Sequence, residues 1–340
     1  MSFWSHSPGP HWSHFFKSLF VCGDSEIGLL NPLLDKVQRT LPAIPGTRVQ
    51  ELTELNAPDI EILLHNHYQT FPRSKLVLSS QRIREGFLYD GWIGVGVFTG
   101  LKLIGCAISR DLGTLQIQSN DVPRAGLVDF FCVMESWRKK GIASFLLQEL
   151  VLLTAKKRRL IHVFQKEGLP LSPIPPVWQS HYIWRKRGSP GGDGSRHYIG
   201  KEGIATRSHI RSFNYASVLP YKGAIASIPH QLSGDSELYS FTYKGHTMSL
   251  CLTDTYHRSV PEGWRIGEIS WILPHGNVPL AVQELAVEAL VDNCEFDVLL
   301  MDATLPHQKT KEWQKDSPYG YYLFNYNPGH FFSLKPYFVL

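Results

Sequence analysis

This chain has few cysteines and no spacing that would give them a structural use. The 340 residues include five, at positions 22, 106, 132, 251 and 294, an odd number spread along the whole length. No CxxC pair or Cys/His cluster has the spacing of a zinc site, so we expect neither a disulfide framework nor a metal. Such usage fits a reducing, cytoplasmic setting.

Long apolar runs and charge of one sign are also missing. The longest apolar stretch, Ser144 to Ala155, is interrupted by Gln148 and Glu149 and is too short to cross a bilayer. The residues after Met1 do not form a signal-peptide pattern. With 34 Lys+Arg against 30 Asp+Glu, the net charge is +4 and scattered, whereas a nucleic-acid-binding chain shows a dense basic stripe. We therefore expect neither a nucleic-acid partner nor integral membrane association. We also expect a monomer.

What the chain does contain is material for a large core. Hydrophobic residues make up 43% and aromatic residues 12% of the sequence, which excludes disorder by composition. At roughly 100–200 residues per domain, this length predicts two domains or one large fold.

The first half alternates helix-like and strand-like patterns. The spacing of apolar residues predicts a helix over Asp59 to His67, a hairpin over Trp92 to Ile108 that turns at Gly100, and a buried strand over Leu127 to Val133. A further helix is predicted from Arg138 and a strand over Leu160 to Gln165.

The second half repeats this style after a glycine-rich stretch. Gly188 to Ser195 is either a domain boundary or an exposed loop within one fold. The predicted elements that follow are a hairpin over Leu238 to Thr253, strands over Ile266 to Leu273, Asp297 to Met301 and Tyr321 to Tyr326, and a helix over Val278 to Val291. A duplicated α/β unit is a plausible interpretation, although no internal sequence repeat supports it.

The most informative segment is a buried strand followed by a basic, glycine-containing loop and an apolar helix. Arg138, Lys139 and Lys140 precede Gly141 and Ala143, whose small size lets backbone N–H groups approach a phosphate at a helix N-terminus. Helix starts ordinarily favour acidic residues, so the three cations disfavour a merely solvated first turn. The pattern resembles the pyrophosphate loop of the acetyltransferase superfamily.

Along the whole chain, segments in the same order resemble N-myristoyltransferases. The matching segments are Phe3 and Trp4 with Pro8 and Pro10, Leu63 to Tyr68, Trp92 to Val97, Lys102 to Gly105, Asp129 to Val133 with Arg138 and Lys140, Ser270 to Leu280, Phe296 to Asp302, and Tyr321 to Tyr326. Their shared order, rather than any one motif, carries the resemblance.

The resemblance implies an α/β (α+β) fold of two GNAT-like acyltransferase halves, related by pseudo-twofold symmetry around a saddle-shaped mixed sheet. Residues 1–190 would bind acyl-CoA and residues 191–340 the peptide. It further implies a glycylpeptide N-tetradecanoyltransferase-like enzyme, which transfers a myristoyl group by direct attack onto the N-terminal glycine amine of a peptide or protein. Myristoyl-CoA would be a co-substrate, with no permanently bound cofactor.

The same resemblance implies the site. The backbone amides of Phe130 and Phe131 would stabilise the tetrahedral oxyanion, Asp129 would lie at the amine, and the terminal carboxylate of Leu340 would be the base. The implied acyl-CoA contacts are Phe3, Trp4, Phe130, Phe131, Cys132, Val133, Arg138, Lys139, Lys140, Gly141, Ile142, Ala143 and Ser144, and the implied peptide contacts are Tyr68, Trp271, Asp302 and Leu340.

Two departures from the family pattern affect substrate choice. Asp129 replaces an asparagine, and the acidic cluster expected after Tyr68 is replaced by Gln69 to Lys75, which contains two cations. We expect peptides with neutral or acidic tails to be preferred over basic ones. Two alternative functions stay open: an N-acyltransferase for shorter chains, and a catalytically weak module that binds acyl-CoA or a peptide.

Overall fold

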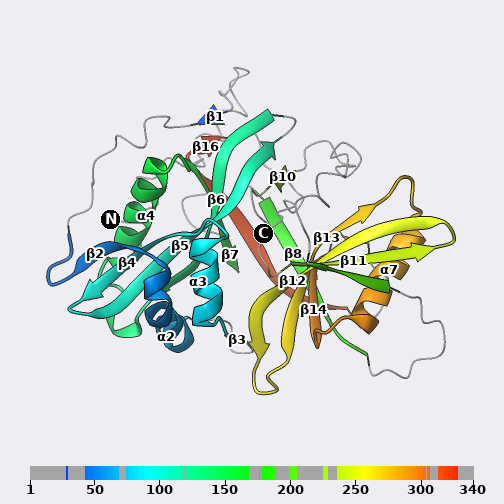
Figure 1. The fold of residues 1–340 in the computed structure, drawn as a ribbon, viewed down its shortest axis with the longest axis horizontal. Coiled ribbons are helices and arrows are strands. Elements are labelled where there is room, and N and C mark those ends of the chain that lie inside the picture. Colours follow the sequence, from blue (N-terminus) through cyan, green and yellow to red (C-terminus); the bar gives the residue numbers. More distant parts are fainter. Residues whose placement is uncertain are drawn as a thin grey trace.

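One long mixed sheet runs through both halves of the molecule (Figure 1). The structure is a computed structural model that describes residues 28–29, 43–68, 74–117, 120–167, 176, 178–188, 199–204, 225–228, 236–303, 305–306 and 313–327. Its fourteen-stranded sheet has the order β2-β4-β5-β6-β7-β15-β8-β14-β13-β12-β11-β9, with β10 on β5 and β3 on β12. A separate pair, β1 and β16, completes the strands of the described residues.

The strands and helices of the first half are β1 (Gly28–Leu29), β2 (Arg48–Leu52), a 3₁₀ helix (Glu54–Asn56), α2 (Ala57–His67), β3 (Ser74–Leu76), α3 (Ser80–Leu88), β4 (Ile93–Thr99), β5 (Lys102–Ile117), β6 (Asn120–Val133), a 3₁₀ helix (Glu135–Trp137), α4 (Ile142–Lys156), β7 (Ile161–Glu167) and β8 (Trp178–Lys186). Those of the second half are β9 (Ile199–Ile204), β10 (Ile225–Ile228), β11 (Ser236–Tyr243), β12 (His246–Ser259), β13 (Arg265–Pro274), α7 (Leu280–Asn293), β14 (Val298–Asp302), β15 (Gln314–Phe324) and β16 (Tyr326–Asn327).

Both halves contain the same unit, so the predicted duplication is confirmed. In the first, the hairpin β5–β6 leads through α4 to β7, which pairs in parallel with β6; in the second, β12–β13 leads through α7 to β14, parallel to β13. Each unit has its own core. One lies beneath α2, α3 and α4, and the other beneath α7.

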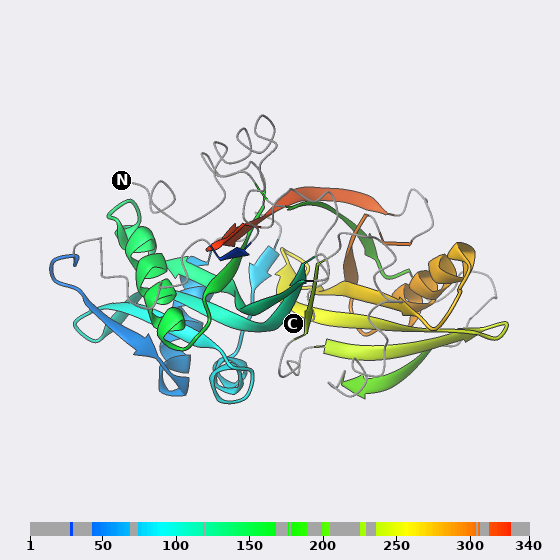
Figure 2. The same cartoon turned by 90° about the horizontal axis from the view of Figure 1, so that it is seen from above.

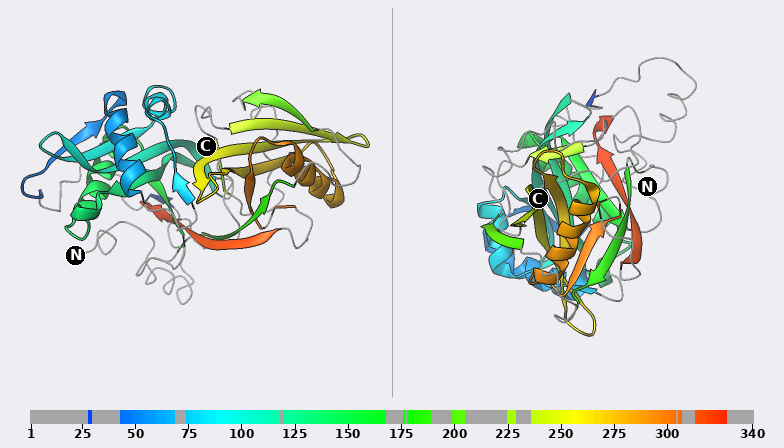
Figure 3. Two further views of the ribbon diagram at one scale, coloured as in Figure 1. Left: turned by 90° about the horizontal axis from the view of Figure 1, so that it is seen from below. Right: turned by 90° about the vertical axis from the view of Figure 1, so that its right-hand side faces the viewer.

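Two strands cross between the halves. β15 pairs with β7 on one side and with β8 on the other, and β8 also pairs with β14. Figure 2 and the left view of Figure 3 show β15 arching across the molecule beside β8. Tyr322 and Phe324 of β15 belong to the first core, and Ile183 of β8 belongs to the second. The glycine-rich stretch lies mostly outside the described residues.

Most predicted elements are confirmed, but several of their bounds differ. The helix predicted from Arg138 begins at Ile142, because Gly141 has a left-handed backbone (φ +84°) that ends the preceding turn. The strand predicted over Tyr321 to Tyr326 is longer: β15 begins at Gln314 and ends at Phe324. Three further strands are also longer than predicted, because β5 extends to Ile117, β6 begins at Asn120 and β12 extends to Ser259. The sequence analysis missed α3, β1, β2, β3, β8, β9 and β10.

Candidate active site at the bulge of β6

The central feature of the site is a β-bulge where β6 separates from β7. The parallel ladder between them ends at the pair Val128–Phe164, while β6 continues to Val133. On its other side, β6 pairs with β5 at Asp129–Ile108 and at Cys132–Cys106, so Phe130 and Phe131 lie opposite Ala107 alone. Phe130 has φ +47°, an uncommon value for a bulky residue. The bulge interrupts the ladder at the two residues predicted to form the oxyanion hole.

Asp129 holds one of those two amides. Its Oδ1 accepts the N–H of Phe130 at 2.7 Å, and its Oδ2 accepts Arg110 Nη1 at 3.1 Å. The amide of Phe130 is therefore already bonded to a carboxylate, and it can donate to a substrate oxyanion only if Asp129 releases it. With a side chain 25% exposed, Asp129 is the most accessible charged group of this cluster.

Stacked arginines and aromatic rings form a wall beside the bulge. The Trp92 ring lies 5.2 Å from the Phe130 ring. The guanidinium of Arg110 lies over both rings, and that of Arg82 lies 5.1 Å from Trp92. Arg82 is itself paired with Asp90 at 2.6 Å. Since both arginines are nearly buried, these contacts fix the aromatic rings in place.

Tyr68 and Cys132 border the same region. Burial, and then the charge of Asp129, raise the pKa of Tyr68, so the phenol stays protonated at neutral pH. Burial raises the pKa of Cys132 to about 12, and its Sγ lies 3.8 Å from the carbonyl of Leu63. A protonated thiol is a poor nucleophile, so transfer through a cysteine acyl-enzyme is not supported.

The loop before α4 presents backbone amides and two exposed lysines. The first helical hydrogen bond runs from Phe145 N–H to the Gly141 carbonyl, so the amides before Phe145 precede the helical ladder. Lys139 and Gly141 both have positive φ, and Lys140 Nζ lies 4.8 Å from the Trp137 ring. Arg138 differs from its neighbours, because its guanidinium donates to the carbonyls of Val133 (3.0 Å) and His67 (2.6 Å). It ties β6 to α2 rather than pointing freely to solvent.

Four other residues were predicted to contact acyl-CoA. Val133 is buried at the end of β6, and Ile142 is buried in the first turn of α4. Ala143 and Ser144 lie on the same turn as Ile142. The predicted peptide residues Trp271 and Asp302 lie on β13 and β14 in the second half, and Asp302 is buried. Phe3, Trp4 and Leu340 lie outside the described residues.

The sequence analysis missed the site residues that come from α3, β5 and β12. Arg82, Arg110 and Tyr256 all adjoin the cluster around Asp129. One signal was available: Arg110 follows the apolar run Leu103 to Ile108 in one strand, and a cation buried there is seldom without a partner.

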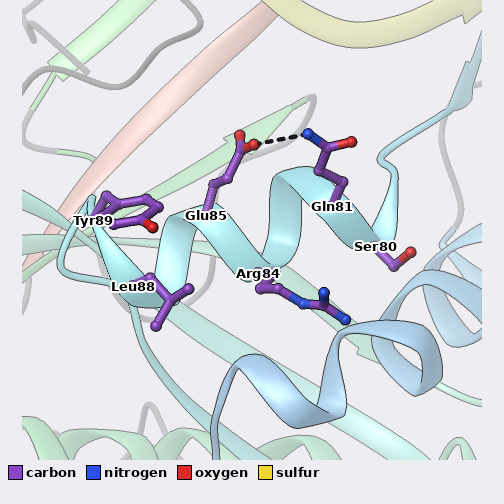
Figure 4. A pocket seen from close by; sticks show the side chains of 6 residues that line it. All are labelled: Ser80, Gln81, Arg84, Glu85, Leu88 and Tyr89. Carbon is purple, nitrogen blue, oxygen red and sulfur yellow. Dashed lines mark hydrogen bonds between the residues drawn. The ribbon is translucent and has the colours of Figure 1, made fainter.

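A hollow on α3 lies apart from this cluster. Figure 4 shows its lining side chains along one face of that helix: Ser80, Gln81, Arg84, Glu85, Leu88 and Tyr89. None of these residues was predicted for the site. Among the described residues no three His, Cys, Asp or Glu side chains are grouped to hold a metal, and no helix has the length and hydropathy to span a membrane.

Comparison with known proteins identifies the fold. No protein-family model and no curated protein sequence matches the chain. It is similar to Saccharomyces cerevisiae N-myristoyltransferase with bound myristoyl-CoA, at a TM-score of 0.70 and 15% identity, over 96% of this chain and 92% of that chain. A second structure of that enzyme matches at 0.67 and 16%, over 96% and 88%. A GCN5-related N-acetyltransferase from Anabaena variabilis matches at 0.50 and 10%, over 83% and 73%. The chain therefore has the mixed α/β fold of N-myristoyltransferases, in which two GNAT-like halves share one large sheet.

Proposed function

We propose that this chain is an acyl-CoA-dependent N-acyltransferase, and more specifically that it transfers a myristoyl group to the N-terminal glycine of a peptide or protein. The observation that carries the proposal is the bulge at Phe130 and Phe131, placed where β6 leaves β7 and followed by the amides before α4. This arrangement offers hydrogen-bond donors for a thioester carbonyl and for a pyrophosphate on one continuous segment.

The acyl donor would lie along the separated edge of β6. Its phosphates would bind the amides at the start of α4, near the exposed Lys139 and Lys140. Arg138 would contribute by holding β6 against α2, since its guanidinium is bonded to two carbonyls. Residues 1–190 would supply most of these contacts, and residues 191–340 would face the peptide.

The amine would bind at Asp129. The attacking nitrogen forms a bond to the thioester carbon while the C–S bond breaks, and the thiolate of CoA leaves and is protonated. Because Asp129 occupies the Phe130 amide, an incoming ammonium would draw the carboxylate toward itself and free that amide for the oxyanion. The terminal carboxylate of Leu340 is the proton acceptor that the family resemblance suggests.

The test is mass spectrometry of peptides that begin with glycine, incubated with the protein and acyl-CoAs of several chain lengths. Acylation at the glycine amine, fastest with myristoyl-CoA, is the expected result. A preference for acetyl- or another short acyl-CoA would support the shorter-chain alternative. Binding of acyl-CoA without any product would instead identify a binding module. The bond between the Phe130 amide and Asp129 favours this alternative, because that amide is not available to an oxyanion while the bond is made.

Charge in the peptide tail is tested in the same pool. Lys75 of β3 and Arg258 of β12 are register partners in the sheet. Arg258 is ion-paired with Asp254, whereas Lys75 Nζ lies 2.9 Å from His65 Nε2, so Lys75 would be the cation beside the tail of the peptide. We expect peptides with Glu downstream of the glycine to be acylated faster than matched peptides with Lys. Equal rates would contradict this expectation.

A further inference from the structure

The backbone of Phe130 is fixed by contacts that do not involve Asp129. Cys106 Sγ donates to the Phe130 carbonyl at 3.3 Å, and both residues are buried. The Phe130 ring lies 5.2 Å from the Trp92 ring, with the Arg110 guanidinium 5.8 Å from its centre. These contacts hold Phe130 at φ +47°, a backbone value that a bulky residue keeps only where its surroundings impose it. The Phe130 N–H therefore keeps its direction when its acceptor changes.

The carboxylate of Asp129, in contrast, reaches solvent. Its side chain is 25% exposed, whereas that of Arg110 is 9% exposed. The ladder between β6 and β7 ends one residue earlier, at Val128, and no strand of the described residues pairs with Asp129 on that side. The two carboxylate oxygens have separate partners: Oδ1 accepts the Phe130 N–H at 2.7 Å, and Oδ2 accepts Arg110 Nη1 at 3.1 Å. One of these bonds can therefore be exchanged while the other is kept.

The bond between Asp129 and the Phe130 amide opposes cleavage of a thioester. Loss of one oxyanion-hole donor slows acyl transfer by roughly 100- to 1,000-fold. While Asp129 accepts the Phe130 N–H, only the Phe131 amide of the two predicted donors remains for the oxyanion. The carboxylate also repels the negative charge that develops on the thioester oxygen. In this resting arrangement the site would cleave a bound thioester slowly.

The two nucleophiles that such a site meets differ in charge. The α-amino group of a peptide has a pKa near roughly 8, so most of it is a cation at neutral pH. Water is neutral. Because hydrogen bonds between charged groups are stronger than those with one neutral partner, an ammonium can take Asp129 from the Phe130 amide, whereas water cannot. The carboxylate therefore distinguishes an amine from water before any bond is made.

We propose that Asp129 blocks the oxyanion hole until a substrate ammonium binds, and that it thereby suppresses hydrolysis of bound acyl-CoA. This regulation rests on the N-acyl transfer proposed for the site. Arg110 keeps Oδ2 while Oδ1 passes from the Phe130 N–H to the ammonium. In the suppressed reaction a water oxygen bonds to the thioester carbon, the C–S bond breaks, and one water proton passes to the sulfur. The products are a free fatty acid and CoA, so the acyl group is lost.

The test measures hydrolysis and transfer separately in Asp129→Ala. Mass spectrometry follows free fatty acid formed from myristoyl-CoA without peptide, and acylated product formed with a glycine-initiated peptide. We expect hydrolysis without peptide to be at least about tenfold faster than in wild type, because the Phe130 amide becomes available to the oxyanion. The KM of the peptide should rise, since its ammonium has lost its counter-charge. A residue that only supports the fold would not speed up hydrolysis.

A second variant allows for loss of stability, because Asp129→Ala leaves Arg110 without this ion pair. Asp129→Ala combined with Arg110→Met removes both charges and places a flexible apolar side chain beside the aromatic rings. The same rise in hydrolysis is expected. The matched control is Glu288→Ala, which breaks another partly buried ion pair, with Arg185 in the second half, and should leave both rates unchanged.

The other outcomes overturn one claim each. Unchanged or slower hydrolysis in both variants, with acyl-CoA still bound, would show that Asp129 does not restrain the oxyanion hole. An equal rise in Glu288→Ala would trace hydrolysis to a loosened fold and would also overturn the proposal. No acylation of any peptide by wild type would overturn the proposed function. Because hydrolysis is measured without peptide, the two failures are distinguished.

The Phe130 amide reports the exchange without turnover. Its proton resonance, displaced by the bond to a carboxylate, should shift when a glycine-initiated peptide binds together with a thioether analogue of acyl-CoA that cannot be cleaved. The same peptide with an acetylated N-terminus carries no cation there and should leave the resonance in place. An equal shift with both peptides would show that the ammonium does not release the amide, and would overturn the proposal.

Discussion

At the scale of single residues, the replacement of an asparagine by Asp129 changes how the site must work. An asparagine at position 129 would be neutral, whereas Asp129 binds both a backbone amide and Arg110 with full negative charge. Hydrogen bonds to a charged group are stronger than neutral ones by roughly a factor of two. Asp129 therefore holds the Phe130 amide more firmly than an asparagine would, and only a cationic ligand offers Asp129 a comparable partner. This chemistry favours an ammonium over a neutral amine as the species that first binds.

Acid sensitivity should originate at another single residue, His162. This histidine is fully buried, its Nε2 lies 2.8 Å from Thr154 Oγ1, and burial followed by the charge of Arg159 lowers its pKa to about 3. The unfolded chain takes this proton near pH 6.5, so between about 6.5 and 3 unfolding binds a proton. The stabilisation is complete above 6.5 and is lost by about 1.4 kcal/mol for each unit that the pH falls below it.

The measurement is the free energy of unfolding by urea at pH 7.5 and at pH 5. His162→Gln removes the titrating group, so the difference between the two pH values should be smaller in this variant than in wild type. The same dependence in both proteins would assign acid sensitivity to other groups.

At the scale of elements, α3 is positioned by a contact that only glycine permits. A Cβ on Gly86 would lie 2.3 Å from Cδ2 of Trp92, the ring that supports Phe130. Alanine is favoured over glycine in a helix by about 1 kcal/mol. Overpacking costs about 1–3 kcal/mol, and the rigid indole has little room to move between two arginines. We expect Gly86→Ala to lower the free energy of unfolding by about 1–2 kcal/mol and to weaken acyl transfer.

The control for this prediction is a double-mutant cycle with Trp92→Phe. The smaller ring should recover part of the stability lost in Gly86→Ala, a coupling that urea unfolding of the four proteins would measure. Additive effects would mean that the alanine disturbs α3 by another route.

The difference between regular elements and bulges explains how much of the architecture could be predicted from the sequence. Elements with a clear apolar period were predicted best: α2 within two residues, and the start and turn of the hairpin β4–β5, although β5 ends nine residues beyond the predicted Ile108. The bulges were not, because a one-residue register shift depends on the partner strand. Phe130 was identified as a site residue by resemblance alone, and its bond to Asp129 had no signal in the sequence. The bulge of β12 follows a polar stretch without period.

At the scale of the whole molecule, the two halves hold each other through exchanged strands. β15 covers the edge of β7, and β8 covers the edge of β14. A chain of polar side chains follows the same path. Gln165 Nε2 lies 3.3 Å from the Tyr321 hydroxyl, and this hydroxyl lies 3.2 Å from the Tyr182 hydroxyl. The Tyr182 hydroxyl donates to Glu268 Oε1 at 2.9 Å. These four residues belong to β7, β15, β8 and β13, so the network spans the junction.

This arrangement predicts that the halves fold only together. Expressed alone, residues 1–190 would keep β7 and β8 but lose the strand between them, and the first core would lose Tyr322 and Phe324. Two unpaired edges in the middle of a sheet favour aggregation. We expect residues 1–190 to be insoluble or to lack a cooperative unfolding transition, and coexpression with residues 191–340 to restore a soluble complex. Full-length protein should unfold in one transition, with equal hydrogen-exchange stability for β6 and β13. A cooperative transition of residues 1–190 alone would contradict this, and would show that the apolar contacts around α2 and α4 suffice without β15.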